Sequence, residues 1–88
     1  MNEITCSPED LFAAGEAFRD ASTDCSAIVE RLNGVMTGLE NRWSGATQQT
    51  FYKNYDEWIL HMNGLAALLK TISIEMDTMG QRFADLDR

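Results

Sequence analysis

NRWSGA, residues 41–46, divides this chain of 88 residues into two long segments, and the only proline in the chain is Pro8. On both sides of the stretch, apolar residues recur at spacings of three and four, the period of an amphipathic helix. Gly45 permits a positive φ or a close backbone approach, and the large Trp43 ring can cover the end of a helical pair. The stretch therefore predicts a turn between two helices.

The segment before the turn predicts one helix over residues 7–40. It opens with a start signal in which Ser7 is the cap, Pro8 takes the first helical position and Asp10 completes a capping box. An unbroken apolar seam then follows at the helical period. The seam consists of Leu11, Ala14, Phe18, Ala21, Cys25, Ile28, Leu32, Val35 and Leu39.

The segment after the turn predicts a second helix over residues 46–85, with a seam of larger side chains. This seam consists of Phe51, Tyr55, Trp58, Met62, Leu65, Leu69, Ile72, Met76, Met79, Phe83 and Leu86. Two such helices joined by about five residues lie antiparallel, and position i pairs with about 87 − i. The expected fold is all-α: one helical-hairpin domain over residues 1–88, with the turn at 41–45 and an overhanging tail at 81–88.

A second apolar stripe runs beside the seam on both helices. A two-helix hairpin covers one stripe of each helix, and every aliphatic or aromatic side chain left exposed forgoes about 1.5–3 kcal/mol. We therefore expect a second hairpin to cover the stripe and complete a four-helix bundle. The partner interface predicted in this way consists of Val29, Met36, Tyr52, Ile59 and Ala66.

Charge and composition exclude several classes of partner. The net charge of −7 and the pI near 4.4 oppose binding to nucleic acid and to anionic membranes. The first ten residues lack a basic region and an apolar run, so we expect no Sec signal peptide and no membrane anchor. Cys6 and Cys25 lie too far apart along one helix to form a disulfide within the chain.

No pattern of catalytic or ligand-binding residues is present in the sequence. His61 is the only histidine, and Glu57 alone accompanies it on its helix face, whereas a di-iron bundle needs Glu-x-x-His pairs on two helices. Ser44 and Ser73 have no histidine partner in the sequence, and a Gly-rich phosphate loop is absent. We therefore expect a protein that binds another helical protein, with no metal, no cofactor and no enzymatic activity.

Trp43-Ser44-Gly45 between two long helices resembles the turn of the WXG family, the ESAT-like substrates and targeting factors of type VII secretion in Gram-positive and mycobacterial cells. The resemblance covers the whole chain. It implies a homodimer or heterodimer of hairpins, made in the cytoplasm and secreted folded, without a Sec signal, by a membrane ATPase-driven (ESX/Ess-like) machine. It also implies a part in virulence or interbacterial competition, as a carrier or an export partner.

The end of the chain departs from the family pattern in one respect. Many members carry a C-terminal export signal, Tyr-x-x-x-Asp/Glu, that works with the Trp-x-Gly turn of the partner hairpin. Here Phe83 and Asp87 occupy the corresponding places, and the aromatic hydroxyl is missing. A Phe-x-x-x-Asp tail is similar to that of the small helical partners of LXG toxins, which implies a hetero-complex with the toxin's helical domain.

Two hypotheses of other classes remain beside type VII secretion. One is a cytosolic coiled-coil adaptor in which Trp-x-Gly is a coincidence. The other is a membrane-active protein, which the charge of −7 and the polar outer faces oppose. A homodimer and a heteromer are both compatible with the sequence, as is a disulfide between two copies of Cys25. The sequence names neither the organism, nor the partner or cargo toxin, nor an activity after export.

Overall fold

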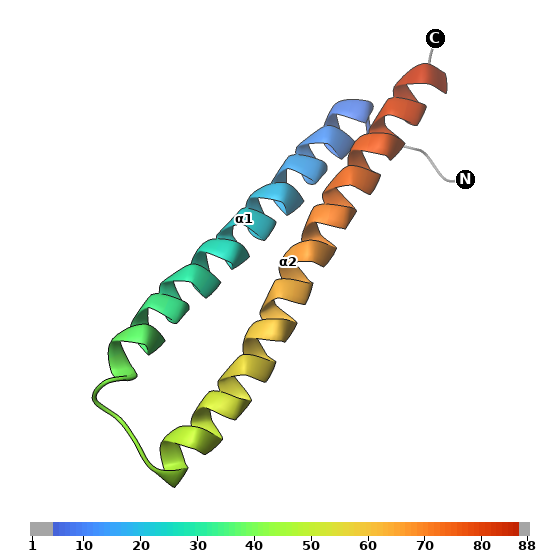
Figure 1. Ribbon diagram of the computed structural model, residues 1–88. Coiled ribbons are helices and arrows are strands. Elements are labelled where there is room, and N and C mark those ends of the chain that lie inside the picture. The colour runs from blue at the N-terminus through green and yellow to red at the C-terminus, as the bar shows by residue number, and fades with distance from the viewer. Residues whose placement is uncertain (1–4, 87–88) are drawn as a thin grey trace.

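The computed structural model describes residues 5–86, which form two antiparallel helices, α1 (Pro8–Leu39) and α2 (Ala46–Leu86) (Figure 1). The turn joins them at one end, and the hairpin is a rod of 65 × 22 × 17 Å. The predicted all-α hairpin is confirmed, and the helix bounds agree with those predicted to within one residue. α2 continues past the start of α1 at the other end (Figure 1).

Local signals start and end the helices as the sequence predicts. The Asp10 N–H donates to Ser7 Oγ at 3.2 Å, and the Ser7 N–H donates to the Asp10 carboxylate at 2.9 Å, which completes the capping box. At the turn, Gly45 has φ of +108°, a conformation that residues with a Cβ rarely adopt. Its carbonyl accepts from the Gln49 N–H at 3.1 Å and so begins α2.

Three hydrogen bonds between the helices define the register. Ser22 Oγ donates to the Ala66 carbonyl at 2.7 Å, and the Tyr52 hydroxyl donates to the Met36 carbonyl at 2.8 Å. The Tyr55 hydroxyl donates to the Asn33 side chain. The residue numbers in each pair sum to 88, one more than predicted. Towards the open end, Gly15 still faces Ser73, so the register is kept there, and the long Arg19 side chain reaches along α2 to form an ion pair with Asp77.

The helices touch along one line of buried residues that repeats every seven positions. On α1 the line contains Gly15, Val29 and Met36, and on α2 it contains Ala66, Ser73 and Gly80. Small residues occupy its far half, and the helices approach closely there: a Cβ on Gly80 would lie 2.9 Å from the Phe12 ring. The two backbones can come close only at these small residues. Their positions therefore decide which stripe of each helix faces the other helix.

The prediction that the second stripe faces a partner is wrong. Val29, Met36 and Ala66 are only 7%, 8% and 7% exposed, and Tyr52 and Ile59 are half-buried, so the stripe lies between α1 and α2 of a single chain. The physical reason is that this stripe continues into Gly15, Ser73 and Gly80, where two backbones can come together. The seam of larger side chains is displaced to one side of the hairpin.

That displaced seam forms an exposed apolar surface, which we call the open face. On both helices several of its residues directly precede buried ones, as Ile28 precedes Val29 and Leu65 precedes Ala66. In antiparallel helices, positions offset in the same sense from the contact line lie on the same side of the pair. The open face comprises Ile28, Leu32, Val35, Trp58, Leu65 and Met79, which are 37–56% exposed.

Two glycines offer a matched test of the helix contact. A Cβ on Gly15 would lie 2.5 Å from Asp77 Oδ1 and 3.1 Å from the Ser73 carbonyl, whereas one on Gly34 meets nothing within 4 Å. Gly15→Ala is therefore expected to destabilise the fold by about 1–3 kcal/mol through overpacking. Gly34→Ala is expected to stabilise it by about 0.5–1 kcal/mol through helix propensity. Denaturant unfolding followed by circular dichroism at one protein concentration measures both, and equal effects would contradict the close contact.

Candidate partner-binding and export site

An aromatic cluster closes the turn end of the hairpin. The half-buried Trp43 ring lies 5.4 Å from the Phe51 ring and 6.3 Å from the Tyr52 ring, centre to centre. Phe51 in turn stacks on Tyr55 and meets Trp58 edge to face at 5.8 Å. Such pairs contribute about 0.5–1.5 kcal/mol each beyond burial of area. Trp43 thus covers the end of the helix pair, as the sequence suggested.

The tyrosines of this cluster tie α2 to the end of α1. The Tyr52 hydroxyl donates to a backbone carbonyl of α1, and that of Tyr55 donates to the Asn33 side chain. Burial, followed by the negative charge of Glu40 and the neighbouring Tyr55 phenol, raises the pKa of Tyr52 above its ordinary value. Tyr52 therefore stays protonated and keeps donating this hydrogen bond at neutral pH.

The turn cluster and the open face form one continuous surface. Trp58 belongs to both, and half of its side chain is exposed. Ser44 and Gly45 lie at the exposed tip of the turn. A partner that covers the open face near this end would therefore also contact the Trp-Ser-Gly turn.

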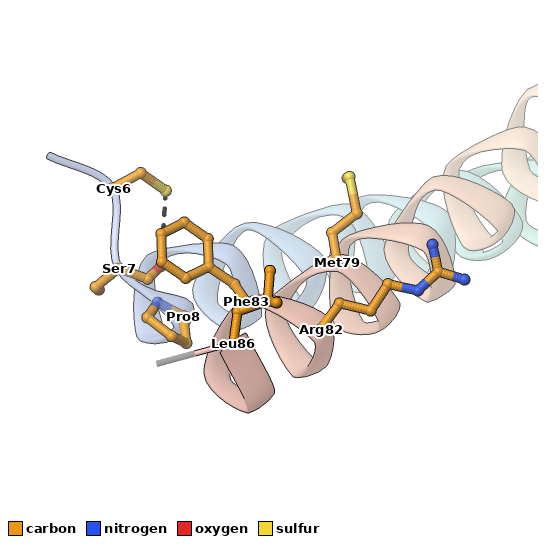
Figure 2. A pocket seen from close by; sticks show the side chains of 7 residues that line it. All are labelled: Cys6, Ser7, Pro8, Met79, Arg82, Phe83 and Leu86. Atoms are coloured by element: carbon orange, nitrogen blue, oxygen red, sulfur yellow. Dashed lines mark hydrogen bonds between the residues drawn. The ribbon is translucent and has the colours of Figure 1, made fainter. Parts of the chain in front are cut away.

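The other end of the hairpin contains an open, mainly apolar pocket of about 660 Å³ (Figure 2). Its lining residues are Cys6, Ser7, Pro8, Met79, Arg82, Phe83 and Leu86. Figure 2 shows the Phe83 ring beside the Cys6–Pro8 segment, and Phe83 is half-buried. The tail predicted over residues 81–88 thus continues past the start of α1 (Figure 1), and the chain at the start of α1 contributes Cys6, Ser7 and Pro8 to the pocket beside it. Asp87, the other residue of the predicted export signal, lies outside the described residues.

One hairpin keeps the two candidate signal elements apart. Trp43 lies at the turn and Phe83 at the opposite end of a rod 65 Å long. An antiparallel pairing of two hairpins would place the turn of one chain beside the tail of the other. Any surface that combines the two elements therefore requires two chains.

Within residues 5–86 the structure contains no cluster of three or more metal-ligating side chains. His61 is exposed on α2. In the same range no helix is both long and apolar enough to cross a membrane. Cys6 is exposed and Cys25 is half-buried, and both are free thiols.

Comparison with known proteins identifies the fold and the family. The chain matches the WXG100 family, described as "Proteins of 100 residues with WXG", over residues 3–88. It is 24% identical over 85 residues to Protein YukE of Bacillus subtilis (strain 168), covering 97% of this chain and 88% of that protein.

Two solved structures have the same hairpin. The secreted protein EsxB of Bacillus anthracis str. Sterne superposes with a TM-score of 0.87 at 28% identity, covering 100% of both chains. Geobacillus thermodenitrificans EsxA also reaches 0.87, at 22% identity over 97% of this chain and 92% of that one.

WXG100 proteins are non-enzymatic, ESAT-like proteins secreted by type VII systems, and homologues form dimers of helical hairpins. The family match spans nearly the whole chain, the paired helices superpose on those of EsxB, and the Trp-Ser-Gly turn sits between them. This chain belongs to the WXG100 family.

Proposed function

We propose that this chain is a non-enzymatic substrate or targeting factor of a type VII (ESX/Ess-like) secretion system, made in the cytoplasm and exported folded as a pair of hairpins. The open face is the observation that carries the proposal. Six large apolar side chains, 37–56% exposed, gather on one side of a hairpin whose homologues form dimers. Covering them with a second hairpin stabilises both chains through burial of apolar area.

The export signal is a composite of two chains. The antiparallel pair brings residues 43–45 of one hairpin beside Phe83 of the other, so a bundle carries two such surfaces, and Asp87 is the second residue of the proposed tail signal. Phe83 presents an aromatic ring in a pocket at the end of α2, and the turn presents the partly exposed Trp43. The secretion ATPase is the proposed receptor for this surface. Because a single hairpin lacks this composite surface, the ATPase would recognise only paired hairpins.

The partner hairpin is a second copy of this chain in the first form of the proposal. In the second form it belongs to the helical domain of an LXG toxin, which this chain escorts to the secretion machine. The observation that favours the toxin partner is the Phe-x-x-x-Asp tail, in which phenylalanine stands where many members have tyrosine. Light scattering on the purified chain distinguishes the two forms, because only the first form predicts a two-chain mass without added partner.

Export is tested by following the chain in cells with an active type VII system. A tag is placed before residue 1, which leaves the end of α2 free. We expect the protein in the culture medium of these cells and only inside cells whose secretion ATPase is inactivated. A cytoplasmic marker protein in the same fractions controls for lysis. Retention inside both strains would contradict export and support the cytosolic adaptor.

A further inference from the structure

A third apolar stripe lies on the outer side of α2, turned away from α1 and from the open face. Leu60, Leu68 and Ile74 are 70%, 54% and 56% exposed, so this stripe contains the most exposed aliphatic side chains of α2 before Leu86. We call it the outer stripe. It consists of Leu60, Gly64, Ala67, Leu68, Thr71, Ile74 and Thr78, all of which are exposed and repeat at the helical period.

Removing water from the outer stripe on binding costs little free energy. From Trp58 to Leu69 the chain contains no Asp, Glu, Lys or Arg. The Thr71 hydroxyl donates to the Ala67 carbonyl at 3.1 Å, and the Thr78 hydroxyl donates to the Ile74 carbonyl at 2.9 Å. Covering these threonines would therefore leave no hydroxyl donor without a hydrogen bond.

The outer side of α1 differs in its charge and in the size of its apolar side chains. Its exposed positions carry alanine and glycine between charged residues such as Asp20, Asp24 and Glu30. A helix that is apolar on all sides is normally buried on all sides, and the middle of α2 has this character while α1 does not. Because pairing through the open face covers only one side of the hairpin, it leaves the outer stripe uncovered.

The arrangement of the outer stripe is close to symmetric about Ala67. Leu60 and Ile74 lie seven residues before and after it, and the smaller Gly64 and Thr71 lie about one turn away on each side. Nothing lies within 4 Å of the Cβ position of Gly64, so a second helix can approach closely there. Two copies that cross antiparallel at Ala67 would place Leu60 of each against Ile74 of the other, as an isologous contact requires.

The charges along one edge of the outer stripe fit the same pairing. A two-fold axis at Ala67 brings this edge of one copy against the same edge of the other. It places His61 next to Glu75, and it brings Arg82 and Lys53 together at each end with Glu57 between them. A carboxylate therefore lies beside a polar or cationic side chain at both places along the edge, and the one like-charge pair has a shared carboxylate.

We propose that the outer stripe binds the outer stripe of a second copy of this chain, antiparallel and centred on Ala67. Two identical hairpins paired through their open faces carry two outer stripes, so the contact joins bundles into a row that does not close on itself. The row depends on the proposed function, in which two copies pair through their open faces. The outer-stripe contact itself does not depend on that pairing. Because each chain carries a net charge of −7, salt is expected to strengthen the contact by screening repulsion.

Site-specific cross-linking tests the two-fold axis. In a background of Cys6→Ser and Cys25→Ser, Ala67→Cys is treated with a short thiol-reactive cross-linker. Ala27→Cys is the matched control, because Ala27 is equally an exposed alanine but lies on α1. Ala67→Cys is expected to give roughly tenfold more linked pairs, since the contact raises the local concentration of the two thiols.

Sedimentation velocity tests the row. The mass of the wild-type protein is expected to rise with concentration beyond that of one bundle, whereas Leu60→Glu with Ile74→Glu is expected to stay at one bundle. Both residues are exposed, so the variant should keep its helicity by circular dichroism. Leu65→Glu, which disrupts the open face, should still allow linking through Ala67→Cys and so separates this contact from the proposed bundle.

Three results would overturn the outer-stripe contact. The first is equal cross-linking of Ala67→Cys and Ala27→Cys. The second is linking through Ala67→Cys that Leu60→Glu with Ile74→Glu leaves unchanged. The third is linking that appears only when anionic phospholipid vesicles are added, which would assign the stripe to a membrane surface.

Discussion

Replacing Leu65 by glutamate is expected to separate the paired hairpins, raising their dissociation constant about 30- to 1,000-fold, or by about 2–4 kcal/mol. Leu65 is 48% exposed in the hairpin and lies near the middle of the open face on α2. In the bundle its side chain would be covered, so a carboxylate there would be buried without a partner charge. Light scattering and analytical ultracentrifugation over a range of concentrations measure the change.

Two glutamate variants control for the added charge and for the face. Ala27→Glu adds the same charge on the exposed outer side of α1 and is expected to leave pairing unchanged. Val29→Glu puts the charge at a site that is only 7% exposed inside the hairpin and is expected to unfold the chain. If Leu65→Glu paired normally while Val29→Glu gave folded single hairpins, the stripe of Val29, and not the open face, would be the partner interface.

Replacing Phe83 by alanine is expected to abolish export, the second large effect. Phe83 is the only aromatic side chain of the pocket at the end of α2, and its ring lies beside Cys6, Ser7 and Pro8 (Figure 2). Losing it removes the aromatic half of the proposed signal. Because the pocket is open and lies at the end of the rod, away from the turn cluster, the variant should remain a helical pair. Immunoblotting of cells and medium measures export, and circular dichroism with light scattering checks the fold.

The controls for this prediction separate the ring from its surroundings. Phe83→Tyr restores the aromatic residue found in many family members and is expected to be exported. Gln81→Ala changes an exposed residue of the same turns and is expected to have no effect. Asp87→Ala tests the second residue of the signal and is expected to behave like Phe83→Ala. Normal secretion of both the Phe83→Ala and the Asp87→Ala proteins would refute the tail signal.

Co-expression tests whether the signal is built from two chains. Trp43→Ala alone is expected to lose export like Phe83→Ala, with the helical pair retained. A mixed pair of these two variants contains one complete surface, from the intact turn of one chain and the intact tail of the other. Export of the mixed pair is therefore expected to return. Loss of folding in Trp43→Ala would leave Trp43 only its packing role against Phe51 and Tyr52.

The helices and their ends could be predicted because their causes are local. The capping box of Ser7 and Asp10, the glycine at the turn and the apolar periods all act within one or two helical turns. A hairpin of two long helices also restricts the register to a narrow range, and the predicted pairing missed by one residue near the turn. The family resemblance depended on the same local feature, Trp43-Ser44-Gly45 between two helices.

The faces could not be predicted in this way, because both apolar stripes satisfy the helical period equally well. The signal that identifies the inner stripe was present in the sequence: Gly15, Ser22, Val29 and Met36 repeat every seven residues, as do Ala66, Ser73 and Gly80. This repeat identifies the buried stripe only once it is known which small residues of α1 contact which small residues of α2. The seam was predicted to lie between the two helices because its side chains are larger.

The sequence by itself determined two amphipathic helices, a glycine turn and a capped start, since neighbours along the chain decide these features. Only the tertiary structure decided which stripe is buried and which remains for a partner. The physical reason is that two helices pack where their backbones come closest. That place depends on residues such as Gly15 and Ser73, which lie far apart in the chain and meet only when it folds.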